Sequence, residues 1–201
     1  MNAVTHFLNI AMLFVLIFGW VVFTLFFLTR KKKPKVAESR RDPASVRGLI
    51  TQMIAFALVW SLRRPVFSPI LSLGWPFDLA MAAVATALLT GSIWLAIAAV
   101  GVLGQQWSYT ARLVEGHALI TEGPYRFVRH PIYTGLFGML LATGLVMTNW
   151  FVLPVAIVVF LIGAKIRIRS EEKLLRDEFG AAYESYARKT PALIPWPHNK
   201  G

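Results

Sequence analysis

The feature of this sequence that most restricts its fold is an uncharged apolar run over residues 5–29. As an α-helix with a rise of 1.5 Å per residue, this run would extend roughly 37 Å, enough to cross a hydrocarbon core of roughly 30 Å. A secretory signal is the alternative, but no basic segment precedes the run, the run is too long, and a basic cluster follows it. We therefore expect a retained transmembrane helix whose N-terminus lies outside.

Composition places the whole chain in a membrane. Hydrophobic residues make up 56% of the chain, charged residues 15%, and the mean hydropathy is +0.58. The net charge of +11 could indicate nucleic-acid binding, but eight of the 21 basic residues follow the first apolar run and eight more lie from Lys165 to the end. Juxtamembrane clusters of this kind mark the cytoplasmic side and attract anionic headgroups. We expect a lipid bilayer as partner and no nucleic acid.

Metal binding and thiol chemistry are not expected. The chain has no cysteine, which excludes disulfides and thiol nucleophiles. The available imidazoles are too scattered along the sequence to form a helical pair with metal-ligand spacing. They are His6, His117, His130 and His198.

Three further apolar runs complete the predicted fold. Residues 48–62 form a short run that ends at two arginines, and residues 79–103 form an Ala-rich run suited to close helix packing. Residues 132–164 are too long for one crossing, so we expect two short helices with a turn at 148–150 and Pro154 in the first turn of the second helix. The prediction is an all-α integral membrane helical bundle with about five transmembrane helices and a cytoplasmic C-terminus.

The connecting segments carry weaker signals. Residues 30–47 indicate a basic cytoplasmic loop with a short surface helix, and residues 65–76 indicate a loop at the opposite interface. After Lys165 we expect a C-terminal cytoplasmic amphipathic helix that Gly180 interrupts only mildly. The tail after residue 190 is expected to be extended. The apolar stripe of the amphipathic helix comprises Leu175, Phe179, Tyr183 and Tyr186.

The segment GPYRFVRHPIYTG, residues 123–135, lies where a polar stretch meets an apolar run. Proline keeps His130 out of the helical region and suits the first turn of a helix, whose free amides near Ile132 and Tyr133 could bind a polar ligand. The alternative is a basic loop that enters a helix, with Arg126 and Arg129 on lipid phosphates. Local physics by itself leaves both readings open.

A pair of acidic residues, Glu171 and Glu172, follows the last apolar run. On a helix, Arg167 lies four residues before Glu171 and Arg169 three before Glu172, so both acids could form ordinary surface ion pairs. Alternatively, the helix returns them to the face that carries His130, where a carboxylate could hold an ammonium group. The spacing is compatible with either arrangement.

The run HALITEGPYRFVRHPIYTG, followed by RIRSEEKLLRDEFGAAYESYARKTPALIPW, resembles the isoprenylcysteine carboxyl methyltransferase family and, more loosely, membrane phospholipid methyltransferases. The likeness covers about residues 104–196. It implies an integral membrane enzyme that transfers the methyl group of S-adenosyl-L-methionine to a lipophilic or prenylated acceptor. The chain would then divide into N-terminal transmembrane helices with a basic linker, residues 1–103, and a methyltransferase-like catalytic region, residues 104–201.

The resemblance also implies residue roles. Arg167, Glu171 and His130 would be catalytic, and Arg167 would bind the acceptor. A carboxylate can pair with the cofactor's α-amino group, aromatic rings can face its sulfonium or adenine, and a helix N-terminus can meet its carboxylate. The residues expected to bind the cofactor are His117, Ala118, Leu119, Ile120, Tyr125, His130, Pro131, Ile132, Tyr133, Glu171 and Glu172.

The resemblance says less about the identity of the methyl acceptor. Thr110 stands where eukaryotic members have glutamine, Pro124 differs in the turn, and the acidic run is shorter than theirs. We expect O-methylation of a carboxylate, which is ionised at neutral pH and needs no base. An amine would have to lose a proton first, with His130 or Glu172 as base. The alternatives are a phospholipid amine N-methyltransferase, an NADPH-dependent membrane reductase and a non-catalytic membrane scaffold. We expect no metal in any of them.

Overall fold

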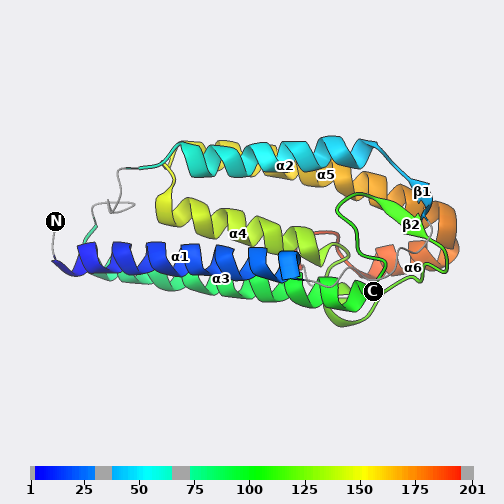
Figure 1. The fold of residues 1–201 in the computed structure, drawn as a ribbon, viewed down its shortest axis with the longest axis horizontal. Helices are drawn as coiled ribbons and strands as arrows, with labels where there is room; N and C mark the ends of the chain where they lie inside the picture. Colours follow the sequence, from blue (N-terminus) through cyan, green and yellow to red (C-terminus); the bar gives the residue numbers. More distant parts are fainter. Residues whose placement is uncertain (1–2, 30–37, 65–72, 196–201) are drawn as a thin grey trace.

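The structure, a computed structural model, describes residues 3–29, 38–64 and 73–195. Its long helices form three layers along one axis (Figure 1). Helix α4 lies in the middle layer, α2 and α5 pair on one side of it, and α1 and α3 pair on the other. The helices are α1 (Ala3–Thr29), α2 (Ala44–Ser61), α3 (Trp75–Leu103), α4 (Pro131–Met147) and α5 (Val152–Phe179).

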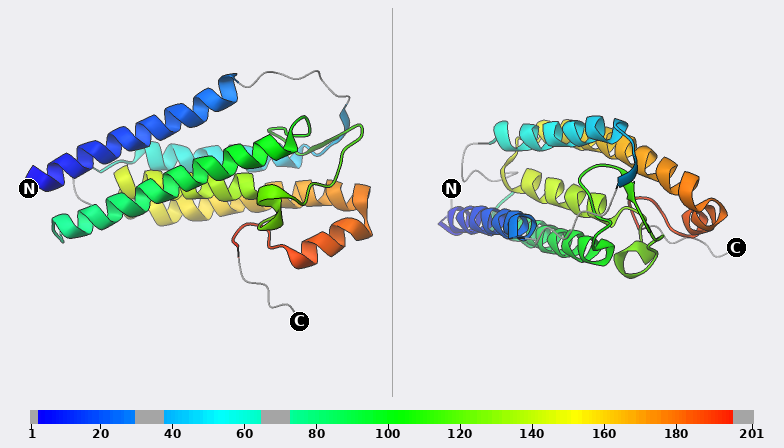
Figure 2. Two further views of the ribbon diagram at one scale, coloured as in Figure 1. Left: turned by 90° about the horizontal axis from the view of Figure 1, so that it is seen from below. Right: turned by 45° about the vertical axis from the view of Figure 1, so that its right-hand side comes forward.

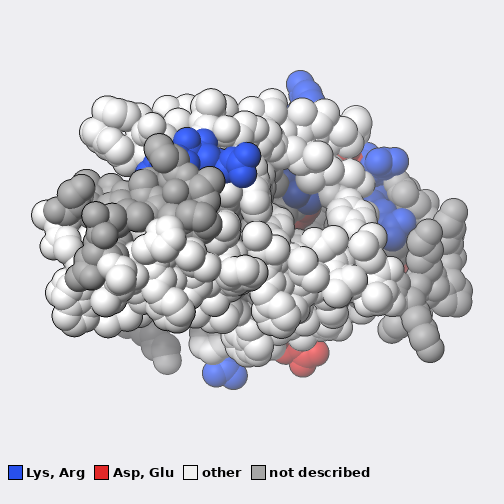
Figure 3. Space-filling model, turned by 60° about the vertical axis from the view of Figure 1, so that its left-hand side comes forward, with Lys and Arg blue, Asp and Glu red and all other residues white. Residues whose placement is uncertain are grey.

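The predicted all-α membrane bundle is confirmed by this architecture. Among the described residues, the stretch His6–Thr29 and helices α2 and α3 are long and apolar enough to cross a bilayer, and α4 is a shorter apolar helix. Much of the side surface carries no charge in the space-filling view (Figure 3). The protein is therefore a membrane protein, while the expected number of five crossings stays a prediction.

Small residues bring helices together around the middle layer. A Cβ atom on Gly163 of α5 would lie 2.7 Å from the carbonyl oxygen of Gly48 on α2, so the two backbones are nearly in contact. In the same way, a Cβ on Gly135 of α4 would lie 2.7 Å from the carbonyl oxygen of Ser92 on α3. These close approaches set the spacing of the helices that carry the site.

The turn between α4 and α5 was predicted correctly, but the short second helix was wrong, because α5 continues without a break to Phe179 and includes the start of the predicted amphipathic helix. Helix α4 ends at Met147, and Pro154 lies in the first turn of α5. The hydroxyl of Thr148 donates to the carbonyl of Val59 at 2.9 Å, which fixes the turn to the end of α2. Because α2 ends at Ser61, the second apolar run does not continue past its two arginines.

The prediction of a short surface helix after α1 is wrong for residues 38–41. Residues Glu38–Arg41 form strand β1, which pairs antiparallel with strand β2, Arg112–Val114. The partner strand lies about seventy residues away, so local periodicity carried no signal for it. Residues 30–37 of the predicted linker, residues 65–72 of the predicted loop and the tail from residue 196 lie outside the described residues.

Gly180 is a full break rather than a mild interruption. Its φ of +47° ends helix α5, and a separate helix α6, Ala181–Lys189, follows. The predicted apolar stripe is therefore divided between two helices. Helix α6 turns back toward the short 3-10 helix η1, Gly123–Arg126 (Figure 2), where the hydroxyl of Tyr186 donates to the carbonyl of Tyr125 at 2.6 Å.

Candidate functional site

His130 lies at the mouth of helix α4. Its backbone is outside the helical region, with φ −124° and ψ 60°, and Pro131 is the first residue of the helix, as the sequence predicted. The amide of Tyr133 is not free, however, because it donates to the carbonyl of His130 at 3.0 Å. The helix start therefore offers a ligand fewer donors than the sequence suggested.

The imidazole of His130 lies between the two glutamates of α5. Its Nδ1 is 3.3 Å from Oε2 of Glu171, and its Nε2 is 3.3 Å from Oε1 of Glu172. The ring of Tyr133 stacks against the imidazole at 5.7 Å, and its hydroxyl donates to Glu171. Side chains from two neighbouring helices, more than forty residues apart, thus meet as the sequence predicted.

The site is electrostatically coupled. Burial by itself would lower the pKa of His130, but hydrogen bonds and attraction from Glu171 and Glu172 outweigh it and raise that pKa. Burial would raise the pKa of Glu172, but hydrogen bonds from His130 and Arg129 lower it to about 2. Burial would also raise the pKa of Glu171, but the hydrogen bonds and positive charges of its neighbours, led by the bond to His130, together outweigh burial and lower it. The centre therefore favours a protonated imidazole between two carboxylates.

Arg129 forms hydrogen bonds inside the protein with α5 and with the end of α6. Its Nε and Nη2 donate to Oε1 of Glu172 at 3.0 and 2.7 Å, and its Nη1 donates to the carbonyls of Ala187 at 2.9 Å and of Thr190. Its backbone amide donates to the carbonyl of Pro191 at 2.8 Å. The side chain is thus engaged inside the protein, and the reading of Arg129 as a contact with lipid phosphates is wrong.

The surface ion pairs considered for the two glutamates do not form as the spacing allowed. Glu172 pairs with Arg129 and, on its other oxygen, with Arg176 at 2.9 Å, rather than with Arg169. Arg167 forms its hydrogen bonds with residues other than Glu171. These two acids therefore belong to an interior network rather than to a solvated helix face.

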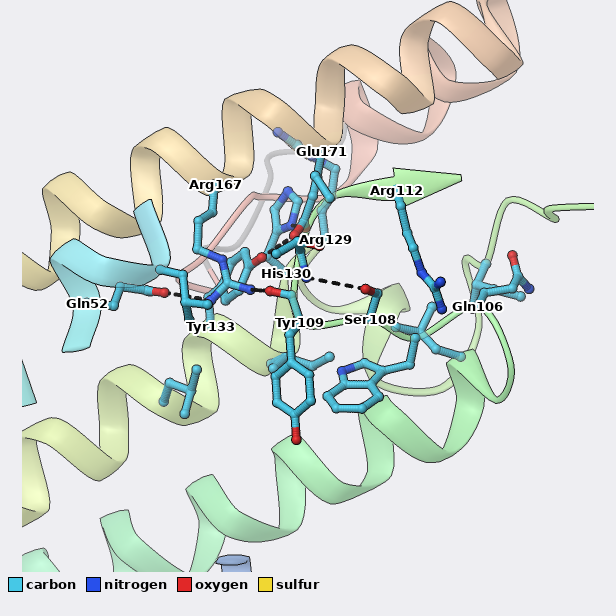
Figure 4. A pocket seen from close by; sticks show the side chains of 18 of the residues that line it. Gln52, Gln106, Ser108, Tyr109, Arg112, Arg129, His130, Tyr133, Arg167 and Glu171 are labelled. Atoms are coloured by element: carbon cyan, nitrogen blue, oxygen red, sulfur yellow. Dashed lines mark hydrogen bonds and ion pairs between the residues drawn. The ribbon is translucent and has the colours of Figure 1, made fainter. Parts of the chain in front are cut away.

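Arg167 crosses from α5 to α2 and to the loop after α3 (Figure 4). Its Nη1 donates to Oε1 of Gln52 at 2.8 Å, and its Nη2 donates to the carbonyl of Tyr109 at 2.7 Å. The guanidinium also lies over the ring of Tyr133, 4.5 Å from its centroid. With 5% exposure, this charge is buried, and the close approach of Gly48 to the Arg167 side chain explains why α2 can reach it.

One cavity of about 610 Å³ joins these groups. Its size lies within the range of small-molecule sites, roughly 300–1,000 Å³. One part is polar and is formed by α4, α5 and the loop after α3. The other part is aromatic and lies between α1 and α2, where Trp20 contacts Phe56 and Trp60 with ring centroids 5.3 and 5.9 Å apart. The cavity therefore suits a ligand with a polar head and an apolar tail.

Most of the predicted site residues line this cavity. Pro131 and Glu172 do not, since Glu172 is engaged by the ion network and Pro131 is buried at the helix start. Whether any of them contacts a cofactor stays a prediction. Those that line the cavity are His117, Ala118, Leu119, Ile120, Tyr125, His130, Ile132, Tyr133, Arg167 and Glu171.

Sequence reasoning missed residues that come from distant parts of the chain. Gln52 is the clearest case, and a signal for it was present, because it is the single amide in the apolar run 48–62. Gln106 and Ser108 follow α3, and Gln106 accepts a hydrogen bond from the amide of Ala118 at 2.9 Å. Within the part of the chain that the structure describes, there is no group of three His, Asp or Glu side chains that could hold a metal ion.

Comparison with known proteins identifies a family. The sequence model of the family described as phospholipid methyltransferase matches residues 80–182, just over half of the chain. The chain is 35% identical over 94 residues to a protein-S-isoprenylcysteine O-methyltransferase of Schizosaccharomyces pombe, covering 46% of this chain and 40% of that protein. It is 36% identical over 86 residues to protein-S-isoprenylcysteine O-methyltransferase B of Arabidopsis thaliana, covering 42% and 43%. The resemblance noted from the motifs is thereby confirmed.

A third relative carries a different name. The chain is 32% identical over 124 residues to a nickel-cobalt-cadmium resistance protein of Alcaligenes xylosoxydans xylosoxydans, with 54% of this chain and 58% of that protein covered. The chain thus spans between about two fifths and three fifths of the length of these three relatives.

Proposed function

Because the chain belongs to the phospholipid methyltransferase family, we propose that it is an S-adenosyl-L-methionine-dependent methyltransferase acting on a carboxylate of a lipophilic acceptor, of the isoprenylcysteine type. The observation that carries the proposal is the meeting of His130 and Glu171 beside Arg167 at the polar end of the cavity. The cavity continues from there into an aromatic region between α1 and α2. A prenyl chain matches that region in polarity.

The residues at the polar end fit the cofactor in charge and kind. When bound, S-adenosyl-L-methionine supplies an activated methyl group on a sulfonium. Glu171, whose pKa is lowered, is an ionised carboxylate that can hold an ammonium group, and Tyr133 and Tyr125 offer rings beside it. The Nδ1 of His117, which is buried in the cavity wall, has no hydrogen-bond partner among the described residues. A buried nitrogen without a partner favours a polar ligand that can form a hydrogen bond with it.

Arg167 is proposed to face the acceptor. Its guanidinium is a cation buried in the cavity wall, so it attracts an anionic group and repels an ammonium group. The hydrogen bonds to Gln52 and Tyr109 hold it in one orientation. A fixed cation can orient the acceptor before reaction, which lowers the entropic part of the barrier.

Charge also favours carboxylate over amine chemistry. A carboxylate is already ionised at neutral pH and requires no proton transfer. An amine would need a neutral base, whereas the two glutamates raise the pKa of His130 and keep its proton. We therefore assign His130 the role of holding Glu171 in place, and we place N-methylation of a phospholipid amine second.

The arrangement in the membrane is also part of the proposal. We propose five crossings, with the N-terminus outside and the polar end of the cavity on the cytoplasmic side. The clustering of basic residues after α1 and from Lys165 onward supports this orientation. The division into residues 1–103 and 104–201 holds for the catalytic motifs only, since α1 and α2 contribute to the cavity wall as well.

The test is transfer of a labelled methyl group. The full chain in detergent or vesicles is incubated with methyl-labelled S-adenosyl-L-methionine and an S-prenylated N-acetylcysteine, and the product is identified by mass spectrometry. A methyl ester at the cysteine carboxylate supports the proposal. Label on a phospholipid amine would favour the second function. Binding of NADPH instead of the methyl donor would indicate a reductase, and binding of neither would leave a scaffold.

Replacing Arg167 by alanine separates the roles of donor and acceptor. We expect Arg167→Ala to impair use of the acceptor by at least about tenfold, the factor that corresponds to 1.4 kcal/mol, while cofactor binding changes little. The matched control is Arg169→Ala, on the exposed side of the same helix. Calorimetry with the cofactor's homocysteine product measures binding separately. Equal loss of both functions would remove the assigned role.

A further inference from the structure

Gln52 is a buried amide in the middle of an apolar helix. Only 2% of its surface is exposed, and its side chain lines the cavity opposite α5. An amide in an apolar environment is unfavourable unless both of its ends have hydrogen-bond partners. Its position therefore requires a polar partner on each side.

The oxygen end of the Gln52 amide has a hydrogen-bond partner. The Oε1 of Gln52 accepts a hydrogen bond from Nη1 of Arg167 at 2.8 Å. Because a guanidinium can only donate, this contact determines which end of the amide is oxygen and which is nitrogen. The Gln52 and Arg167 side chains point toward one another from α2 and α5 (Figure 4).

The other side has no partner. The Nε2 of Gln52 is buried and has no hydrogen-bond acceptor among the described residues. Leaving such a donor unsatisfied costs about 1–3 kcal/mol. Nε of Arg167, in the same cavity wall, also lacks a partner among the described residues. Two adjacent side chains of one cavity wall thus hold unused donors beside a positive charge, and a ligand that supplies negatively charged oxygen atoms would complement them.

We propose that Gln52 is a specificity-determining residue of the acceptor site, whose Nε2 donates a hydrogen bond to the acceptor carboxylate next to the charge of Arg167. This inference rests on the proposed methyltransferase function and adds a residue from α2, which lies outside the part of the chain matched by the family. It explains why an amide is retained in a membrane helix. It also provides discrimination, because an ammonium group cannot accept this hydrogen bond.

A purely structural role makes a different prediction, and Gln52→Glu distinguishes the two. The variant keeps the oxygen that Arg167 binds and strengthens that contact with a charge, so the position of Arg167 is preserved. It replaces the free donor with a carboxylate oxygen, which repels an anionic acceptor. If Gln52 only held Arg167, glutamate would still weaken an anionic acceptor by its charge, but it would leave the binding of the acceptor's neutral carboxamide unchanged.

The experiment measures acceptor and cofactor separately on the full-length protein in detergent. We expect Gln52→Glu to raise the KM for an S-prenylated N-acetylcysteine, and its dissociation constant by calorimetry, at least about tenfold. The affinity for the cofactor's homocysteine product should change less than about twofold. Gln52→Met, which removes both ends of the amide, should also weaken the acceptor. Gln105→Glu makes the same chemical change at an exposed position and should leave both constants unchanged.

A matched pair of ligands checks the chemistry directly. The wild-type protein should bind the S-prenylated acid more tightly than its neutral carboxamide, and Gln52→Glu should weaken both ligands, because the carboxamide oxygen also loses the hydrogen bond from Nε2. An unchanged KM for the acid, or an unchanged affinity for the carboxamide, in Gln52→Glu would overturn the inference while leaving methyl transfer by the wild type intact. Absence of methyl transfer by the wild type, together with no binding of the acid, would instead refute the proposed function.

Discussion

Replacing Glu172 by glutamine removes one negative charge from the centre of the ion network with almost no change of shape. The carboxylate contacts Arg129 and His130 through one oxygen and Arg176 through the other, and its side chain is 8% exposed. Although burial opposes ionisation, the hydrogen bonds from His130 and Arg129 lower its pKa from the usual 4.5 to about 2. The charged form of Glu172 is thus strongly favoured in the folded protein.

The expected loss of stability follows from that difference in pKa. At 1.36 kcal/mol per pKa unit, it corresponds to about 3 kcal/mol at neutral pH. For a chain of this size, 1 kcal/mol changes Tm by about 2–4 °C, so Glu172→Gln should lower Tm by about 6–12 °C. Because the folded-state pKa is lowered, this stabilisation is present above about pH 4.5 and is lost as the pH falls toward 2. The difference between the two proteins should shrink over that range.

Tryptophan fluorescence of the detergent-purified protein, which has seven tryptophans, can follow thermal unfolding of both proteins from neutral to acidic pH. The control is Asp177→Asn, the same kind of neutralisation at an exposed position of α5, which should change Tm by no more than about 1–2 °C, as surface substitutions of about ±0.5 kcal/mol do. The reasoning fails if Glu172→Gln lowers Tm no more than this control does. It also fails if the difference stays constant on acidification.

Two further substitutions test the helix contact and the imidazole. Gly163→Ala should destabilise the protein by about 1–3 kcal/mol, because the new methyl group would lie 2.7 Å from the carbonyl of Gly48, whereas Gly91→Ala, which meets nothing within 4 Å, should be neutral or slightly stabilising in thermal unfolding. The raised pKa of His130 means that its contribution is fully present below its usual pKa of 6.5 and is lost as the pH rises through the raised value. The Tm of the wild type should therefore fall more steeply than that of His130→Gln as the pH rises above 6.5, and parallel curves would contradict the assignment.

The motifs identified the centre of the candidate site because their signals are local. Proline after His130 determines both the backbone at the loop end and the start of α4, and Pro154 marks the start of α5 in the same way. The apolar run before Glu171 has the length needed to return to the face where it began. Length, charge and proline placement left the meeting of His130 and Glu171 as one of two alternatives, and the resemblance to a methyltransferase family selected it.

Gly180 shows the limit of local reasoning. A glycine inside a helical pattern costs only about 1 kcal/mol, so the sequence alone predicted a continuous helix. The contact between Tyr186 of α6 and Tyr125 of η1 requires the chain to turn back, and glycine permits the φ of +47° that makes the turn. The strand pair β1–β2 escaped prediction for a related reason, since each strand is too short to show a period without its distant partner.

By itself, the sequence determined that the chain enters a membrane, where α4 begins and where the chain turns into α5, because hydrophobic length and proline geometry act within a few residues. Its motifs assigned His130 and Glu171 to one site through their resemblance to a family. Only the tertiary structure decided which charges pair and what lines the cavity. Arg129 engages Glu172 and Arg167 engages Gln52 across 43 and 115 residues of chain. Such contacts depend on helices packing backbone to backbone at Gly48 and Gly163, which no pattern within a single helix encodes.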